Sequence, residues 1–244
     1  MTLTSSLINL LLLALATTTY SHPHPHNQTA QSLPVPYGMV LADCAVPGTI
    51  ALTFDDGPYI YTPALLDILA DHGVRATFFV NGYRLTDHID ALQRIVAEGH
   101  QLASHTYNHA YLPSLDYANI VSEMQGLEDL LREFVGVVPR YMRPPYLAMD
   151  GRVLAAMDDL GYHVIGASID TKDFERDDPW LIHDSIRRFV DGVNAGGTIV
   201  LAHDLYTQTV YTLTRAMLEE IAKRGLHATT VAECMGDPRE YWYR

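Results

Sequence analysis

One feature constrains the fold of this chain more than any other: short β-rich runs alternate with longer stretches whose apolar residues recur at helical spacing. The β-rich runs predict seven strands, at residues 49–54, 75–80, 101–104, 141–143, 163–169, 198–202 and 227–231. Because strands that alternate with helices form parallel sheets, we expect an α/β fold with a parallel sheet.

The stretches between these strands predict six helices. The first begins at Thr62, has Pro63 in its first turn and ends at Gly73. The others span residues 91–98, 115–134, 152–160, 180–190 and 210–224. Seven such units fit a short or incomplete β/α barrel, and an open doubly wound sheet is the alternative. The chain has no Gly-x-Gly-x-x-Gly or P-loop sequence, which disfavours a nucleotide-binding sheet.

The overall charge limits the partners that the protein can bind. The formal net charge is -13 at pH 7. Nucleic acids and anionic membranes attract basic surfaces, so neither is an expected partner, whereas a neutral glycan is compatible with this charge. A simpler interpretation, in which the acidic residues only keep a secreted protein soluble, remains open.

The first 40 residues are predicted to lie outside the folded domain. Residues 7–16 form an apolar run that is too short to span a membrane, as in a signal peptide. We expect a signal peptide over residues 1–21, cleaved after Ala16 or Ser21, and therefore a secreted, extracellular protein, either free or associated with the cell wall. Residues 22–40 are predicted to be a disordered, Pro/His-rich leader, in which Asn27 begins a glycosylation sequon. A single domain of residues 41–244 follows.

The two cysteines lie near the two ends of this domain. In an oxidising compartment, the pair Cys44 and Cys234 indicates one disulfide that joins these ends. Two free buried thiols are the alternative.

Titratable residues follow several of the predicted strands, at the points where these strands end. They are Asp55, Asp56, His105, His109, Arg143, Asp170, Asp173, His203 and Asp204. In β/α barrels the C-terminal ends of the strands converge on one face, where active sites lie. The sequence therefore predicts that separate segments contribute these side chains to one pocket.

A histidine pair in this set has the spacing of metal ligands. His105 and His109 are four residues apart, which places two imidazoles on one side of a turn. Either Asp55 or Asp56 can supply a third ligand. Two imidazoles and one carboxylate leave a coordination position open, as in catalytic sites, and Zn²⁺ is the expected ion, with Co²⁺ as an alternative.

The remaining polar residues have both a catalytic and a structural interpretation. Asp55 and Asp56 can form a simple turn with the Gly and Pro that follow, or one can bind the metal while the other acts as a base. His203 can be a structural histidine, or a general acid kept protonated by Asp173. Arg143 can be a surface residue, or its planar guanidinium can orient a carboxylate such as Asp55.

Taken together, five motifs resemble those of the polysaccharide deacetylase family, the NodB-homology group of carbohydrate esterases. In order, they are residues 53–58 (TFDDGP), 104–109 (SHTYNH), 143–146 (RPPY), 170–174 (DTKDF) and 201–204 (LAHD). The resemblance covers about residues 37–244. Within the family, the chain looks most similar to the fungal chitin deacetylases, because of residues 74–82 (VRATFFVNG), 141–143 (YMR), 170–173 (DTKD) and the paired terminal cysteines.

This resemblance implies a distorted (β/α)7-type barrel and a role for each site residue. Asp55 would be the base, and one divalent ion would be held by Asp56, His105 and His109. Arg143 would orient Asp55, and His203 would be the acid, tuned by Asp173. The backbone N–H of Tyr146 would bind the oxyanion. Two positions depart from the family pattern and bear on substrate fit: Phe174 stands where Trp is frequent, and Ala202 where a larger or polar residue is common.

The implied activity is metal-dependent hydrolysis of N-acetyl groups from chitin or chitin oligosaccharides, by a protein that we expect to be a monomer. Three alternatives remain. The substrate can be another glycan, such as peptidoglycan or acetylxylan. The protein can be a non-catalytic carbohydrate-binding relative. A metal-dependent phosphoesterase is the third, although such a site usually recruits a second metal and more basic residues.

Overall fold

The structure is a computed structural model that describes residues 35–244. The predicted signal peptide, the leader up to residue 34 and the sequon at Asn27 lie outside the described residues. Within residues 35–244, none of the helices has the length and apolar character that crossing a membrane requires.

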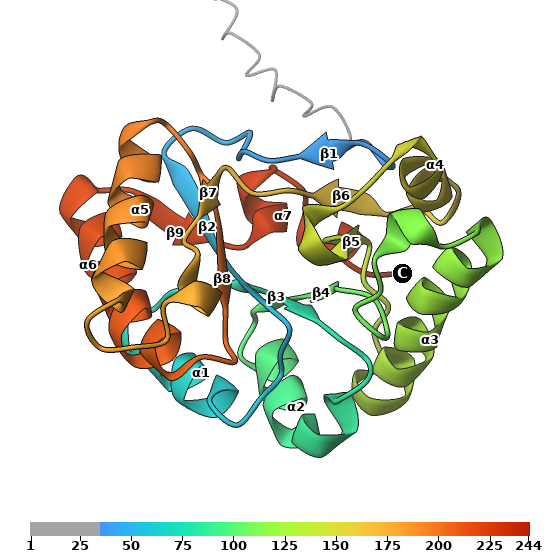
Figure 1. Ribbon diagram of the computed structural model, residues 1–244, viewed down its shortest axis with the longest axis horizontal. Coiled ribbons are helices and arrows are strands. Elements are labelled where there is room, and N and C mark those ends of the chain that lie inside the picture. Colours follow the sequence, from blue (N-terminus) through green and yellow to red (C-terminus); the bar gives the residue numbers. More distant parts are fainter. Residues whose placement is uncertain (1–34) are drawn as a thin grey trace, which may run out of the picture. The chain divides into compact units, whose positions relative to one another are not determined.

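Within residues 35–244, nine parallel strands form one strongly curved sheet (Figure 1). They are β1 (Val40–Leu41), β2 (Thr49–Asp55), β3 (Thr77–Val80), β4 (Gln101–Ser104), β5 (Tyr141–Met142), β6 (His163–Ile165), β7 (Ile169–Asp170), β8 (Ile199–His203) and β9 (His227–Thr229). Their order is β1-β6-β5-β4-β3-β2-β8-β7, and β9 pairs with β2. No pairing joins the edge strands β1 and β7 within residues 35–244, so the barrel is incomplete. The predicted β/α barrel is thereby confirmed over the doubly wound alternative.

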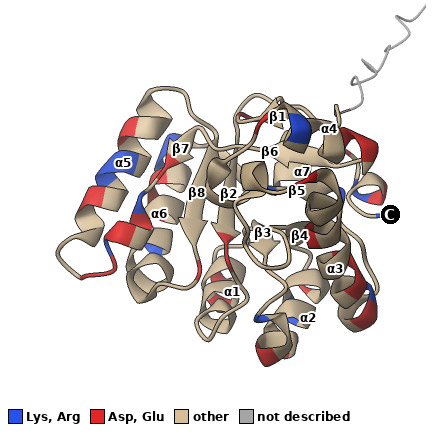
Figure 2. Ribbon diagram, turned by 45° about the vertical axis from the view of Figure 1, so that its right-hand side comes forward, with Lys and Arg blue, Asp and Glu red and all other residues tan. Residues whose placement is uncertain are grey.

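The longer helices surround the sheet on its outer side (Figure 1). They are α1 (Thr62–Asp71), α2 (Ile89–Ala97), α3 (Tyr117–Val135), α4 (Gly151–Asp159), α5 (Ile182–Asn194) and α6 (Thr214–Arg224). Their apolar stripes are buried: in α1, Leu65, Leu66 and Leu69 pack in the same core cluster as outward-facing strand residues. Figure 2 shows charged residues mainly on the helices and loops, while most of the strand surface is uncharged.

Two of the sequence-based assignments differ from the structure around β6. The predicted strand 163–169 is two strands, β6 and β7, and residues 166–168 between them belong to neither. A side chain at Gly166 would press on Val40 and Ala42. Residues 36–40, assigned to the disordered leader, are also ordered. Tyr37 stacks on His163, and β1 pairs with β6. The folded domain therefore begins before residue 41.

The N-terminal face of the barrel, where the strands begin, is closed by the C-terminal part of the chain. The predicted strand 227–231 ends at Thr229, and α7 (Val231–Cys234) follows with a capping box between Thr230 and Glu233. Trp242 is fully buried against α7 and the inward-facing residues of the strands. A disulfide joins Cys44 to Cys234, with Cα atoms 5.0 Å apart, as the sequence predicted.

Candidate active site

The pleat of the strands directs four polar residues into the C-terminal face, where the strands end. One residue in the interior apolar cluster comes from each of β2, β4, β5 and β8, namely Ala51, Ala103, Tyr141 and Ile199. Because successive side chains alternate across a strand, residues two or four positions further along face the same way. These residues are Asp55, His105, Arg143 and His203. The alternation that builds the apolar interior therefore also aims the polar residues into one site.

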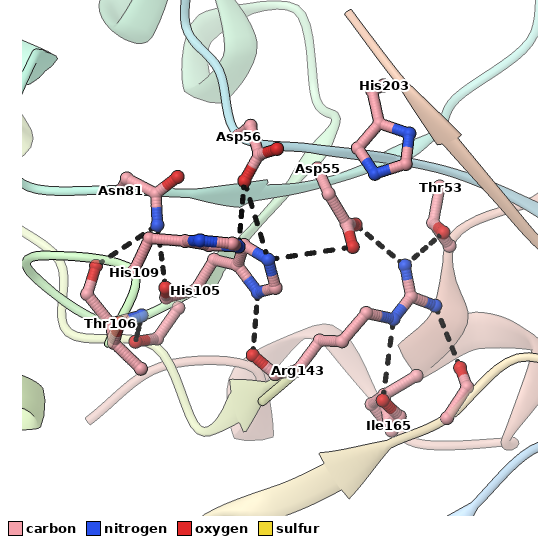
Figure 3. A network of polar contacts seen from close by, with 12 residues as sticks. Thr53, Asp55, Asp56, Asn81, His105, Thr106, His109, Arg143, Ile165 and His203 are labelled. Carbon is pink, nitrogen blue, oxygen red and sulfur yellow. Dashed lines mark hydrogen bonds and ion pairs between the residues drawn. The ribbon is translucent and has the colours of Figure 1, made fainter. Parts of the chain in front are cut away.

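Asp56, His105 and His109 form a group that could hold a metal ion, and within residues 35–244 it is the only such group of three or more. The Nε2 atoms of His105 and His109 lie 3.5 and 3.4 Å from Oδ1 of Asp56 (Figure 3). Asp56 and His109 have positive φ angles of 72° and 56°, which turns their side chains out of the regular backbone path. Of the two aspartates considered as the third ligand, the structure brings Asp56 to both imidazoles.

The chemical state of these side chains fits a divalent cation. Oδ1 of Asp56 is buried and has no hydrogen-bond partner within the described part of the chain. Nδ1 of His105 lies 2.7 Å from the backbone oxygen of Arg143, so that Nδ1–H donates and Nε2 keeps its lone pair. Burial lowers the pKa of His105 to about 3, which keeps the imidazole neutral, as a metal ligand must be.

Asp55 and Arg143 form a buried ion pair beside this group. Nη1 of Arg143 donates to Oδ1 of Asp55 at 2.7 Å and to the hydroxyl of Thr53 at 2.6 Å. Nη2 and Nε donate to the backbone oxygens of Gly166 and Ile165, and the guanidinium lies over the ring of Phe79. Arg143 is thus held on every side and fixes the Asp55 carboxylate, rather than being a surface residue.

The environment of Asp55 suits a base. Burial raises the pKa of its carboxyl, although the Arg143 cation and its hydrogen bond act in the opposite direction. Oδ2 of Asp55 lies 3.8 Å from Nε2 of His105, so the carboxylate faces the candidate metal position without being one of its nearest ligands. The two neighbouring aspartates therefore differ in surroundings.

The turn that carries Asp56 is held from two sides. On one side, the N–H of Asp56 donates to the oxygen of Phe79, and the N–H of Asn81 donates to the oxygen of Gly57. On the other side, the buried carboxylate of Asp204 lies against Gly57, where any side chain would collide with it. Thr62 donates to this carboxylate at 2.5 Å and accepts from the N–H of Tyr59. These contacts explain why the turn keeps the backbone conformation that aims Asp56 at the histidines.

Asn81 braces the loop of the first histidine. Its buried amide donates to the backbone oxygens of His105 and Thr106, at 2.7 and 3.5 Å (Figure 3). Thr106 has a positive φ of 69°. The amide therefore links the end of β3 to the loop after β4 and stabilises an unfavourable backbone conformation next to His105.

His203 lies on the opposite wall and is bound to a buried aspartate. Its Nδ1 is 2.8 Å from Oδ1 of Asp173, while the other oxygen of Asp173 accepts from the N–H of His203 and from the hydroxyl of Thr209. Burial lowers the pKa of His203, but the Asp173 carboxylate more than offsets this effect and raises it to about 9. The imidazole is therefore protonated at neutral pH and can donate a proton from Nε2.

These groups line one cleft with a volume of about 380 Å³. Its lining includes Asp55, Asp56, His105, His109 and His203, together with Tyr146, Phe174, Lys172, Leu201 and Tyr206. Arg143 and Asp173 do not line the cleft, but they contact two residues that do, Asp55 and His203. Tyr146 has a φ of 60°, and no hydrogen bond involves its backbone N–H within residues 35–244. All the predicted site residues in the described part of the chain thus come together, apart from the cysteines on the N-terminal face.

Sequence reasoning missed several supporting residues. Asn81 follows β3 directly, so the rule that strand ends converge could have found it. Thr53 lies two residues before Asp55 and faces the same way, which the alternation along β2 would have shown. Thr209 carries no such sign, because only its contact with Asp173 gives it a role.

Comparisons with known proteins agree with this arrangement. A model of the family described as polysaccharide deacetylase matches residues 42–165. A chitin deacetylase of Colletotrichum lindemuthianum is 42% identical over 86% of this chain and 88% of that protein. The solved structure of the chitin deacetylase from this fungus has a TM-score of 0.84, covering 86% of this chain and 97% of that one.

A second fungus supplies longer relatives. A probable peptidoglycan-N-acetylglucosamine deacetylase of Arthroderma benhamiae is 51% identical over 86% of this chain, and a chitin deacetylase of the same fungus is 49% identical over 86%. The matched part is 49% and 58% of these two proteins, so the chain spans about half the length of each.

Proposed function

Because the chain belongs to the polysaccharide deacetylase family, we propose that it hydrolyses the N-acetyl groups of N-acetylglucosamine units in chitin or chitin oligosaccharides, in a metal-dependent reaction. One observation carries the proposal. A candidate metal group, a fixed carboxylate and a protonated imidazole face the same cleft. Together these groups can supply what hydrolysis of an amide by water requires: an activated water, a base and an acid for the leaving amine.

Each residue of the site has its own role in the proposed reaction. Asp56, His105 and His109 would hold the ion, for which Zn²⁺ is the expected metal and Co²⁺ also fits. When bound, a divalent ion polarises the amide carbonyl and makes water a stronger acid. Asp55, held by Arg143, accepts the proton of the attacking water. The backbone N–H of Tyr146 donates to the oxyanion.

His203 completes the reaction on the other side of the cleft. Its protonated Nε2 gives a proton to the leaving nitrogen, so that acetate departs and a glucosamine unit remains. Asp173 and Arg143 act through their neighbours, His203 and Asp55, and are positioning residues. The disulfide between Cys44 and Cys234 supports an extracellular site of action, since such bonds persist in oxidising compartments.

Peptidoglycan is a second candidate substrate. The observation that favours it is the 51% identity to the probable peptidoglycan-N-acetylglucosamine deacetylase of Arthroderma benhamiae. Both polymers contain N-acetylglucosamine, so the same residues would act on the same amide, and only the neighbouring sugars would differ.

Mass spectrometry of products from defined chitin oligosaccharides tests the proposal. We expect the stepwise loss of acetyl groups and the release of acetate, with peptidoglycan fragments and acetylated xylan as parallel substrates. Chelation should abolish the reaction, and Zn²⁺ or Co²⁺ should restore it. A faster reaction on peptidoglycan fragments would replace the proposed substrate, and full activity in enzyme shown by elemental analysis to be metal-free would reject the metal. If none of the substrates changes mass, the enzymatic proposal itself fails.

A further inference from the structure

Two exposed tyrosines form a row that leads from the metal group out of the cleft. Tyr146 lines the cleft with 67% of its surface exposed, and its ring packs edge-on against His109 at a centroid distance of 4.5 Å. The ring of Tyr111, which is 53% exposed, lies 6.2 Å beyond that of Tyr146 and outside the cleft lining. The row His109–Tyr146–Tyr111 therefore starts at a candidate metal ligand and ends on the open surface.

The loop that carries Tyr111 is held in place by hydrogen bonds. The backbone oxygen of Tyr111 accepts from both the N–H and the hydroxyl of Ser114. Arg152 in α4 donates to the backbone oxygens of Pro113 and Leu115, at 2.8 and 3.4 Å. The backbone that carries this large, exposed aromatic side chain is thus held in place. Rigid aromatic rings with exposed faces are suited to stacking on the apolar faces of sugar rings.

The size of the cleft leaves the rest of a polymeric substrate outside it. About 380 Å³ encloses the sugar that reacts but not a glycan chain. The neighbouring sugars must therefore lie on the surface that surrounds the cleft. On the side of His109, that surface is the tyrosine row.

We propose that Tyr111, aligned with Tyr146, forms a binding subsite for a sugar unit of a β-linked N-acetylglucosamine chain next to the unit that is deacetylated. This inference rests on the proposed function and adds a specificity residue to the same site. Tyr111 touches neither the metal group nor the reacting amide in this arrangement. Its contribution is therefore to binding, and it requires a substrate of at least two sugar units.

The test compares chitin oligosaccharides of two and five sugar units on three variants. Tyr111→Ala removes the ring, Tyr111→Phe keeps it, and Tyr241→Ala removes an equally exposed tyrosine (54%) from the C-terminal tail at the N-terminal face. For the pentamer, Tyr111→Ala should raise KM by roughly threefold to tenfold, the usual range for one aromatic contact, with little change in kcat. The loss in kcat/KM should be no larger for the dimer, because a dimer can also react with its only neighbouring sugar on the other side of the cleft. Tyr111→Phe and Tyr241→Ala should stay within about twofold of the wild type.

Each outcome decides the matter. An unchanged pentamer KM in Tyr111→Ala overturns the subsite. The subsite is also overturned if Tyr241→Ala loses as much pentamer kcat/KM as Tyr111→Ala. Thermal unfolding of all variants excludes a general loss of folding, which would lower kcat for both substrates. If the wild-type enzyme releases no acetate from either oligosaccharide, the proposed function has failed. In that case, calorimetric titration with the pentamer tests the subsite independently, and equal affinity in the wild type and Tyr111→Ala overturns it.

Discussion

Residues with a left-handed backbone differ between the two faces of the barrel. At the N-terminal face, glycine takes such positions: within residues 35–244, eight glycines with positive φ each precede a strand, and a ninth, Gly236, follows α7. At the C-terminal face, six described residues with side chains do so, namely Asp56, Thr106, His109, Tyr146, Leu147 and Lys172. All six follow the ends of strands, and five of them line the cleft.

This difference shows that the two faces are under different physical requirements. Glycine adopts positive φ without steric penalty, whereas other residues lose about 1 kcal/mol or more. The C-terminal face keeps side chains in this conformation and also buries the charges of Asp55, Arg143 and Asp173. The N-terminal face instead buries Trp242 and is joined by the disulfide. We therefore expect substitutions at one face to change the reaction and at the other to change stability.

The strongest test at the C-terminal face is Asp55→Asn, which keeps the size of the side chain but removes the base. Deacetylation should fall by roughly 10²- to 10⁴-fold, while the metal stays bound because Asp55 is not among its nearest ligands. Asp56→Asn should instead weaken metal binding, and excess metal should partly restore the rate. His203→Ala should resemble Asp55→Asn. Metal content and rate are measured together, and loss of metal from Asp55→Asn with retention in Asp56→Asn would exchange the two roles.

At the N-terminal face, Trp242→Ala should have the opposite profile. The indole is fully buried and its N–H donates to the oxygen of Asp237, so its loss leaves a cavity and one unpaired acceptor. We expect the free energy of unfolding to fall by about 3–5 kcal/mol, measured by urea denaturation. The rate of the protein that remains folded should stay within about twofold of the wild type, and a larger loss would show that the two faces are coupled.

The pH dependence of kcat/KM tests a finer feature of the C-terminal face, the acid His203. Because His203 has a pKa raised to about 9, it acts as an acid below that pH, and kcat/KM should fall as pH rises through about 9. In Asp173→Asn the carboxylate is gone and burial remains, so the falling limb should move to lower pH. The same pairing contributes stability that is fully present below the unfolded pKa of about 6.5 and is lost as pH rises through the folded value. An unmoved limb in Asp173→Asn would assign the acid to another group.

The smallest expected effect isolates the free-energy cost of a positive φ angle at a residue that has a side chain. Gly225 ends α6 with a φ of 65°, and a methyl group there would meet no other atom within 4 Å. Gly225→Ala should therefore destabilise the protein by about 1 kcal/mol and leave the rate unchanged. Gly151→Ala is the matched control, because Gly151 has equally open space but lies in the first turn of α4 without a positive φ. Equal losses in the two variants would contradict the conformational explanation.

Much of the fold could be predicted from sequence because strands and helices alternate regularly along the chain. Each longer strand and helix has enough residues to show its period, and glycines end several of the helices. β1 has only two residues, too few for any period, and its partner β6 lies more than a hundred residues away. The helix α7 was predictable in principle, since Thr230 and Glu233 have the spacing of a capping box, but the preceding β-rich run suggested a longer strand.

The candidate site also contains parts that could be predicted from the sequence and parts that could not. Residues that end strands, such as Asp55, His105 and His203, could be predicted because the ends of parallel strands converge. Their assigned roles rested on the family resemblance and stay proposals. Two of the contacts that fix them, from Arg143 to Asp55 and from His203 to Asp173, were also expected. Other supporting contacts could not be predicted, because neither partner's chemistry points to the other. Asp204, which follows the neighbouring strand β8, supports the turn at Gly57, and neither residue alone indicates this contact.

The disulfide makes the domain a covalent ring. Cys44 and Cys234 are 190 residues apart, and every residue assigned to the cleft lies on the segment between them. A protease that cuts one loop of this segment opens the ring into a linear chain but releases no fragment, so both pieces of the cleft stay attached to each other. If the enzyme acts outside the cell, as proposed, a single cut by a protease there therefore leaves the parts of the active site in one molecule.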